Sequence, residues 1–141
     1  MAVNTAPIFS AKGDIEWTTV QTAANATYDG TAGTLATVFS ASVDGGFVQR
    51  LRFKASGSAT GTVARVFINN GQSTTSAANN VLFDEITLAS TSATQTAATA
   101  VYELPLNIAL PAGYRILTAL GTVQSAGGGW YAVAVGGSYS V

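Results

Sequence analysis

The stretch that decides the fold runs from Val101 to Val123 and has the sequence VYELPLNIALPAGYRILTALGTV. Apolar side chains occupy every second position before Pro111-Ala112-Gly113 and most even positions after it, which is the period of a half-buried β-strand. They are Tyr102, Leu104, Leu106, Ile108 and Leu110 on one side and Tyr114, Ile116 and Leu120 on the other. Pro111 fixes φ for the first corner of a turn, and Gly113 suits the last position. The stretch therefore predicts a β-hairpin.

Pro105 lies in the middle of the first arm of this predicted hairpin. A proline has no backbone N–H to donate to a central strand ladder. We therefore expect this arm to be an edge strand, or to be bulged at Pro105.

The rest of the chain repeats the pattern of short apolar runs separated by segments rich in Gly, Ser, Thr and Asn. A second hairpin is expected at Asp44-Gly45-Gly46, because short Asp-Gly links between strands favour that turn. No window of a dozen residues keeps a helical period. The sequence predicts an all-β protein: a β-sandwich of about eight strands, jelly-roll-like, with little or no helix. The further strands are expected at Asp14–Val20, Leu35–Val43, Phe47–Ala55, Thr62–Asn69, Val81–Leu88 and Trp130–Val135.

Period-two alternation also predicts which side chains face the core. We expect Ile15, Trp17 and Trp130 to point inward, since aromatic residues in strands usually pack in the core. Leu82, Ile86 and Leu88 are expected inward, with Asp84 either at a lip of the sandwich or hydrogen-bonded. In the strand after Gly46, one face carries Phe47, Leu51, Phe53 and Ala55, and the other carries Val48, Arg50, Arg52 and Lys54.

The three cations of that strand, Arg50, Arg52 and Lys54, are half of the six basic residues in the chain. Like charges along one strand face are unfavourable unless water solvates them or a partner supplies carboxylates. They are therefore either a solvated face or a docking stripe for an acidic partner. As a docking stripe, they are a candidate interface with a partner protein or with a neighbouring subunit.

Residues 1–12 are expected to form an N-terminal arm or edge strand, and residues 13–141 a single β-sandwich domain. The first ten residues carry no charged side chain. Such an arm can be a frayed edge or an extension that pairs with a neighbouring subunit. Its candidate interface residues are Val3, Pro7, Ile8 and Phe9.

The amino-acid composition limits the classes of function that the protein can have. Only 9% of the 141 residues are charged, against roughly 25% in ordinary soluble domains, and the net charge is -1. A neutral surface favours self-association, whereas the absence of a Lys/Arg run argues against nucleic-acid binding.

No stretch of 18 consecutive apolar residues occurs, and the first residues lack the basic segment followed by an apolar segment that is typical of a signal peptide. The sequence predicts a soluble protein with no Sec signal and no membrane partner.

The chain contains no His and no Cys. Ser-His-Asp hydrolysis, Cys-His chemistry and zinc-thiolate sites therefore lack an essential group. Asp84 and Glu85 are adjacent, so on a strand they point to opposite faces and do not make a glycosidase pair. Asp14 and Glu16 share a face, but no calcium-loop spacing accompanies them. We predict no enzyme activity, no cofactor and no metal site.

The C-terminal half resembles a family of small virion proteins of tailed bacteriophages. The resemblance spans roughly residues 80–138 and lies in Leu82-Phe83-Asp84-Glu85-Ile86-Thr87-Leu88, Glu103-Leu104-Pro105-Leu106, Leu110-Pro111-Ala112-Gly113-Tyr114-Arg115 and Gly129-Trp130 with Val135-Gly136-Gly137. It implies a β-sandwich subunit that decorates and stabilises the capsid shell as a cement protein, bound to the major capsid protein. The expected location is the capsid surface of the virion, and the host cytoplasm during assembly.

Two expectations follow from this resemblance combined with composition. A homotrimer is expected, because capsid shells offer threefold positions and a neutral surface is buried at small cost. The alternative function is a carbohydrate-binding or structural module of a phage tail fibre or spike. Carbohydrate binding requires an exposed Trp or Tyr in a groove.

Overall fold

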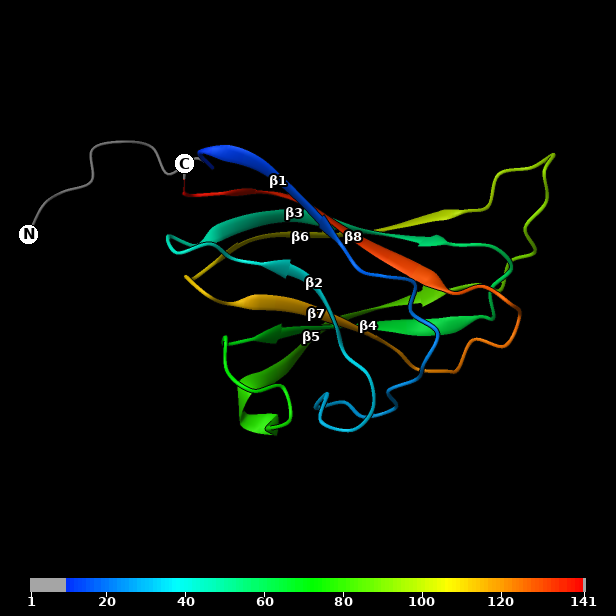
Figure 1. Ribbon diagram of the computed structural model, residues 1–141, viewed down its shortest axis with the longest axis horizontal. Helices are drawn as coiled ribbons and strands as arrows, with labels where there is room; N and C mark the ends of the chain where they lie inside the picture. Colours follow the sequence, from blue (N-terminus) through cyan, green and yellow to red (C-terminus); the bar gives the residue numbers. More distant parts are fainter. Residues whose placement is uncertain (1–9, 141) are drawn as a thin grey trace, which may run out of the picture.

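A computed structural model describes residues 10–140 as two four-stranded antiparallel sheets packed face to face (Figure 1). We call them sheet A and sheet B. In spatial order, sheet A consists of β1 (Lys12–Trp17), β8 (Trp130–Ser138), β3 (Gly46–Ala55) and β6 (Val101–Leu110). Sheet B consists of β2 (Ala36–Ser40), β7 (Arg115–Leu120), β4 (Thr62–Asn69) and β5 (Asn80–Leu88). The one helical element described is the short 3₁₀ turn η1 (Ala77–Asn79). The predicted β-sandwich of about eight strands is confirmed.

The connections between strands almost all cross from one sheet to the other. Only β4 and β5 are consecutive strands that pair side by side. This alternation between two four-stranded sheets is the jelly-roll arrangement, as the sequence predicted. No helix within residues 10–140 is long and apolar enough to cross a membrane.

Both predicted hairpins are therefore wrong, although their turns lie where expected. Tyr114 N donates to Pro111 O at 3.1 Å and Gly113 has φ of 75°, but this turn joins β6 in sheet A to β7 in sheet B. The Asp44-Gly45-Gly46 turn likewise joins β2 to β3 across the sandwich. The apolar faces of the two arms meet across the core, and this arrangement needs the same period-two pattern as a hairpin.

The first arm is an edge strand, as Pro105 predicted: β6 ends the order of sheet A. The pairing register shifts between Val48 and Arg50, opposite Pro105, and Asn107 has a positive φ of 51°. The same shift gives β3 one extra residue relative to β8, so the faces of β3 exchange there. Val48 is fully buried with Leu51 and Phe53, which corrects the prediction that Val48 shares the face of Arg50.

The core lies between the sheets and contains the inward residues of both. The predicted inward side chains of β6 belong to it: Leu106 and Leu110 are buried, and Tyr102, Leu104 and Ile108 pack against the cluster. Trp130 is 1% exposed, as predicted, and its ring meets that of Tyr102 edge to face at 5.8 Å between centroids. The indole Nε1 donates to Thr60 O at 3.3 Å.

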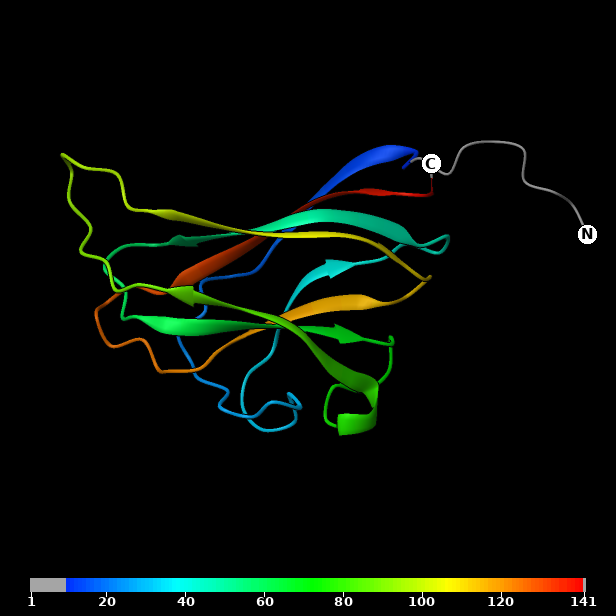
Figure 2. The same ribbon diagram turned by 180° about the vertical axis from the view of Figure 1, so that it is seen from behind.

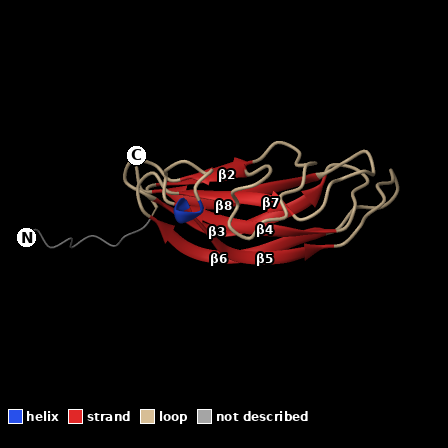
Figure 3. Ribbon diagram, turned by 90° about the horizontal axis from the view of Figure 1, so that it is seen from below, coloured by secondary structure: helices blue, strands red, loops and turns tan. Residues whose placement is uncertain are grey.

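The outer face of sheet B is covered by the loop between β1 and β2, which lies on the side away from sheet A (Figures 1 and 3). Phe67, Leu117 and Ala119 form a second buried cluster there, against Leu35 of the loop and Leu82 of β5. Leu82 was predicted to face the core with Ile86 and Leu88. A register shift in β5 adds one residue at Phe83 and turns Leu82 to the outer face instead.

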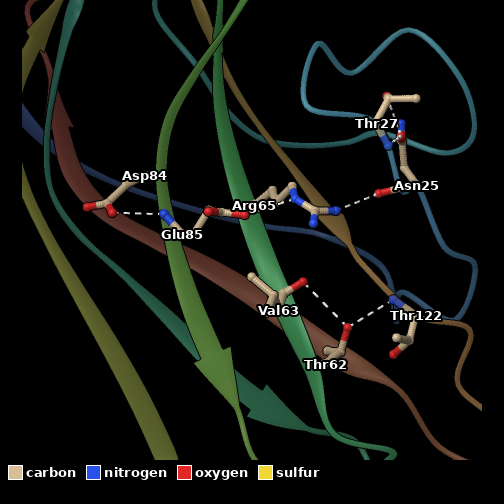
Figure 4. Close-up of polar contacts among 8 residues, drawn as sticks. All are labelled: Asn25, Thr27, Thr62, Val63, Arg65, Asp84, Glu85 and Thr122. Carbon is tan, nitrogen blue, oxygen red and sulfur yellow. Dashed lines mark hydrogen bonds and ion pairs between the residues drawn. The ribbon is translucent and has the colours of Figure 1, made fainter.

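Arg65 pins this loop to sheet B. Its Nε donates to Glu85 Oε1 at 2.9 Å, and its Nη1 donates to Asn25 O at 3.1 Å (Figure 4). The guanidinium also lies 4.3 Å from the ring centroid of Tyr28. Arg65 is buried, so these partners compensate the cost of removing its charge from water.

Strand β1 has the opposite orientation to the one predicted. Ile15 and Trp17 point to solvent and are 58% and 68% exposed. The carboxylate face is turned toward the neighbouring edge of sheet B, where Glu16 Oε2 accepts a hydrogen bond from Ser40 N at 3.1 Å. Because β1 is an edge strand, its inward-pointing side chains lie at the side of the sandwich, beside the edge strand β2, and not in the centre of the core. A carboxylate there can accept a hydrogen bond from a backbone N–H of β2.

Candidate interaction surface

The outer face of sheet A carries an ordered array of apolar and charged side chains, and no described segment covers it (Figure 1). Strand register arranges it in columns. The apolar columns belong to β1 and β8, the cationic column to β3, and the last column to β6. Across the strands the rows are Trp17, Val133, Arg52 and Glu103; then Ile15, Val135, Arg50 and Pro105; then Tyr131, Lys54 and Val101.

A shallow hollow lies in the middle of this face, where the apolar and cationic columns meet. It is lined by Ile15, Val133, Val135 and Val101, together with Arg52 and Lys54. Exposed apolar side chains gathered around a hollow and rimmed by charge are typical of interaction sites rather than of ordinary surface.

The structure places the three predicted stripe residues, Arg50, Arg52 and Lys54, together on this face. Glu103 of β6 organises two of them. Its Oε1 lies 2.9 Å from Arg52 Nε and 3.6 Å from Arg50 Nε. Lys54 Nζ donates to the backbone oxygen of Thr99. The face thus carries three cations against one carboxylate.

Arg50 keeps unused hydrogen-bonding capacity. Its Nη1 donates to Gln49 Oε1 at 2.7 Å, whereas its buried Nε has no hydrogen-bond partner among the described residues. Sequence reasoning missed Glu103 as the counter-ion. Its period-two position on β6 shows that it faces outward, but the chain pattern does not reveal that β6 pairs with β3.

The arm residues Val3, Pro7, Ile8 and Phe9 lie outside the described residues. Their assignment to an interface stays a prediction.

A second surface feature is a groove at the side of the sandwich, where the edge strands β1 and β2 lie next to each other. Residues 17–23 and 34–37 line it, and none of these residues is charged. Five of them are threonines, and Trp17, an exposed residue, is also among those that line the groove. An exposed indole beside hydroxyl groups is the arrangement that carbohydrate binding requires.

Two carboxyl groups among the described residues have shifted pKa values. Burial raises the pKa of Glu16, and the nearby charge of Asp14 adds to the rise, against the lowering effect of the Ser40 N–H. Hydrogen bonds from the backbone N–H and hydroxyl of Thr31 lower the pKa of Asp29. Ionised Glu16 is therefore less favourable in the folded state, so its contribution to stability is lost as pH rises through its folded pKa.

The described residues contain no group of three or more Asp or Glu side chains placed to hold a metal ion. Of the adjacent pair on β5, Glu85 binds Arg65, and Asp84 Oδ1 accepts from the backbone N–H of Glu85 at 2.8 Å. Neither arrangement is that of a catalytic carboxylate pair.

No family model and no curated protein matches the chain. Among solved structures, one match is to the "Structure of infectious bursal disease virus Gt strain", with 13% identity and a TM-score of 0.30. The match covers 97% of this chain and 36% of that chain. A TM-score of this size is too low to indicate a shared fold or a shared function.

Proposed function

We propose that the protein is a structural protein of a tailed-phage virion, which decorates and stabilises the capsid shell in contact with the major capsid protein. The observation that carries this proposal is the open outer face of sheet A. It gathers exposed apolar side chains and three cations, while the outer face of sheet B is covered by the chain's own loop. A face of this kind suits binding to a neighbour.

Three further points support the proposal. Jelly rolls are frequent among viral capsid and lectin domains, although a fold alone does not define a function. The resemblance of residues 80–138 is to tailed-phage virion proteins. Because only 9% of the residues are charged, burying the surface in a contact has a small desolvation cost. The virion surface and, during assembly, the host cytoplasm are the corresponding locations.

The proposal predicts that the cationic stripe holds the protein on the particle. Replacing Arg50, Arg52 and Lys54 together by Gln is expected to lower occupancy on purified particles at least about tenfold. The neutral Gln side chains can no longer form ion pairs with carboxylates of the neighbouring protein. Occupancy of the unmodified protein should also fall with salt, since exposed pairs are screened over about 8 to 10 Å. Occupancy can be measured by quantitative mass spectrometry of washed particles.

Lys12→Gln is the matched control, because Lys12 is an exposed cation on β1 outside the stripe, and it should keep full occupancy. Circular dichroism of the triple variant checks that it folds. Unchanged occupancy of the triple variant at both low and high salt would reject the docking stripe.

One observation favours the alternative, a carbohydrate-binding module of a tail fibre or spike. Trp17 was predicted to be buried, yet it is exposed and is among the residues that line an uncharged groove rich in threonine. The C–H face of a sugar can stack on such an indole while its hydroxyls bind threonine. The two candidates differ in copy number, because a shell protein is repeated over the particle and a fibre module is not.

A further inference from the structure

A second exposed surface carries charge of the opposite sign to the outer face of sheet A. It lies on β5, the free edge of sheet B, on the same side of the sandwich as the free edge β6 (Figure 2). Val81 and Phe83 are 57% and 43% exposed, and Asp84 and Glu85 are exposed beside them. Val81, Phe83 and Asp84 therefore present an acidic and apolar strip, whereas Glu85 is paired with Arg65 on the outer face of sheet B.

The charges of the two surfaces have opposite signs. The outer face of sheet A holds Arg50, Arg52 and Lys54 against Glu103, which leaves two positive charges in excess. The rest of the chain holds the other three basic residues and six of the seven acidic ones. Of the two acidic residues on β5, Glu85 is paired with Arg65, so Asp84 supplies the negative charge of the strip. Each surface also offers apolar side chains, so a contact between them would bury apolar area and pair opposite charges.

Contact of either surface with itself is unfavourable. Two sheet A faces brought together by a twofold axis would oppose two surfaces that each carry an excess of two positive charges. Two β5 edges paired in the same way would bring Asp84 of one copy near Asp84 of the other, and a charge on an edge strand is a recognised device against edge-to-edge pairing. Like-charge repulsion thus selects against both symmetric dimers and leaves the mixed contact.

We infer that copies of this chain associate head to tail, with the β5 strip of one copy seated on the outer face of sheet A of the next. Val81 and Phe83 would enter the apolar columns, and Asp84 would face the cationic column. A head-to-tail contact closes into a ring where its rotation allows, a trimer being the smallest such ring, and otherwise extends as an open filament. This inference rests on the proposed function, and it names the next copy of this chain, rather than the major capsid protein, as the neighbour that the outer face of sheet A binds.

The test uses the isolated protein, so that its failure is separate from failure of the virion role. Sedimentation velocity of the unmodified chain should show oligomers that grow with concentration from micromolar to near-millimolar and weaken with salt. A face variant carries Arg52→Glu and Lys54→Glu, and an edge variant carries Phe83→Ser and Asp84→Ser. Each is expected to associate at least about tenfold more weakly than the unmodified chain.

Mixing the two variants gives the decisive result. The face variant keeps its β5 strip and the edge variant keeps its sheet A face, so one good contact remains for each mixed pair. The mixture should form one-to-one heterodimers that grow no further. An edge variant that still dimerises would indicate face-to-face pairing, and a face variant that still dimerises would indicate β5 pairing. Either result, or an unmodified chain that stays monomeric, would overturn the inference.

A cross-linking measurement on the unmodified chain tests the same contact without depending on whether the variants fold. The chain has two lysines, Lys12 and Lys54. A zero-length carbodiimide, applied to a mixture of ¹⁵N-labelled and unlabelled protein, should join Lys54 of one copy to Asp84 or Glu85 of another. Lys12 serves as the internal control. Intercopy links that use Lys12 and omit Lys54 would contradict the arrangement.

Discussion

Replacing Trp130 by Ala is expected to lower the free energy of unfolding by about 3 to 5 kcal/mol. The side chain is 1% exposed at the start of β8, packs edge to face on Tyr102, and donates its Nε1 hydrogen to Thr60 O. The substitution leaves a cavity in the core and removes the donor of the Thr60 oxygen. Urea unfolding followed by circular dichroism measures the loss.

Trp17→Ala is the control for this prediction. Trp17 is the same residue type on β1, which pairs with β8, but its side chain is 68% exposed. Its removal should change the free energy of unfolding by no more than about 0.5 kcal/mol. If the two substitutions cost the same, the orientation assigned to β1 would be wrong.

Gly136→Ala is the second substitution with a large expected effect, a loss of about 3 kcal/mol. A methyl group on Gly136 would overlap the carbonyl oxygen of Phe47 and lie 3.1 Å from Val48 Cα. These are backbone atoms of β3, so the overlap can be relieved only by moving β3 and β8 apart in the middle of sheet A. The same urea unfolding experiment measures this loss.

Gly13→Ala is its matched control on the edge strand of the same sheet. A methyl group there meets no atom within 4 Å. Its effect should stay within about 1 kcal/mol and can be stabilising, since Ala restricts the unfolded chain. A Gly136→Ala variant as stable as Gly13→Ala would mean that β3 and β8 are not packed as closely as described.

The sequence predicted the strands and the sandwich because period-two apolar patterns depend only on which side of a strand is buried. It could not predict topology at Pro111-Ala112-Gly113, since a turn within one sheet and a turn between two sheets follow the same apolar pattern. The difference lies in which strands share backbone hydrogen bonds. These partners are 47 or more residues apart in the case of β3 and β6, and no local signal reports them.

The candidate site was predicted in part. Arg50, Arg52 and Lys54 could be assigned to one face because their spacing is local to β3. Their counter-ion Glu103 depends on the pairing of β3 with β6, and the register shift that buries Val48 depends on the same pairing. The exposure of Trp17 was missed because an amphipathic edge strand does not show which of its faces meets the core.

The position of the protein on the virion tests the central claim most directly. A cryo-EM map of purified particles that contain the protein gives its copy number and the surfaces it buries. The proposed shell role predicts on the order of hundreds of copies at symmetric positions over the capsid, with the outer face of sheet A buried in a contact. A few copies confined to the tail, with that face exposed to solvent, would contradict it.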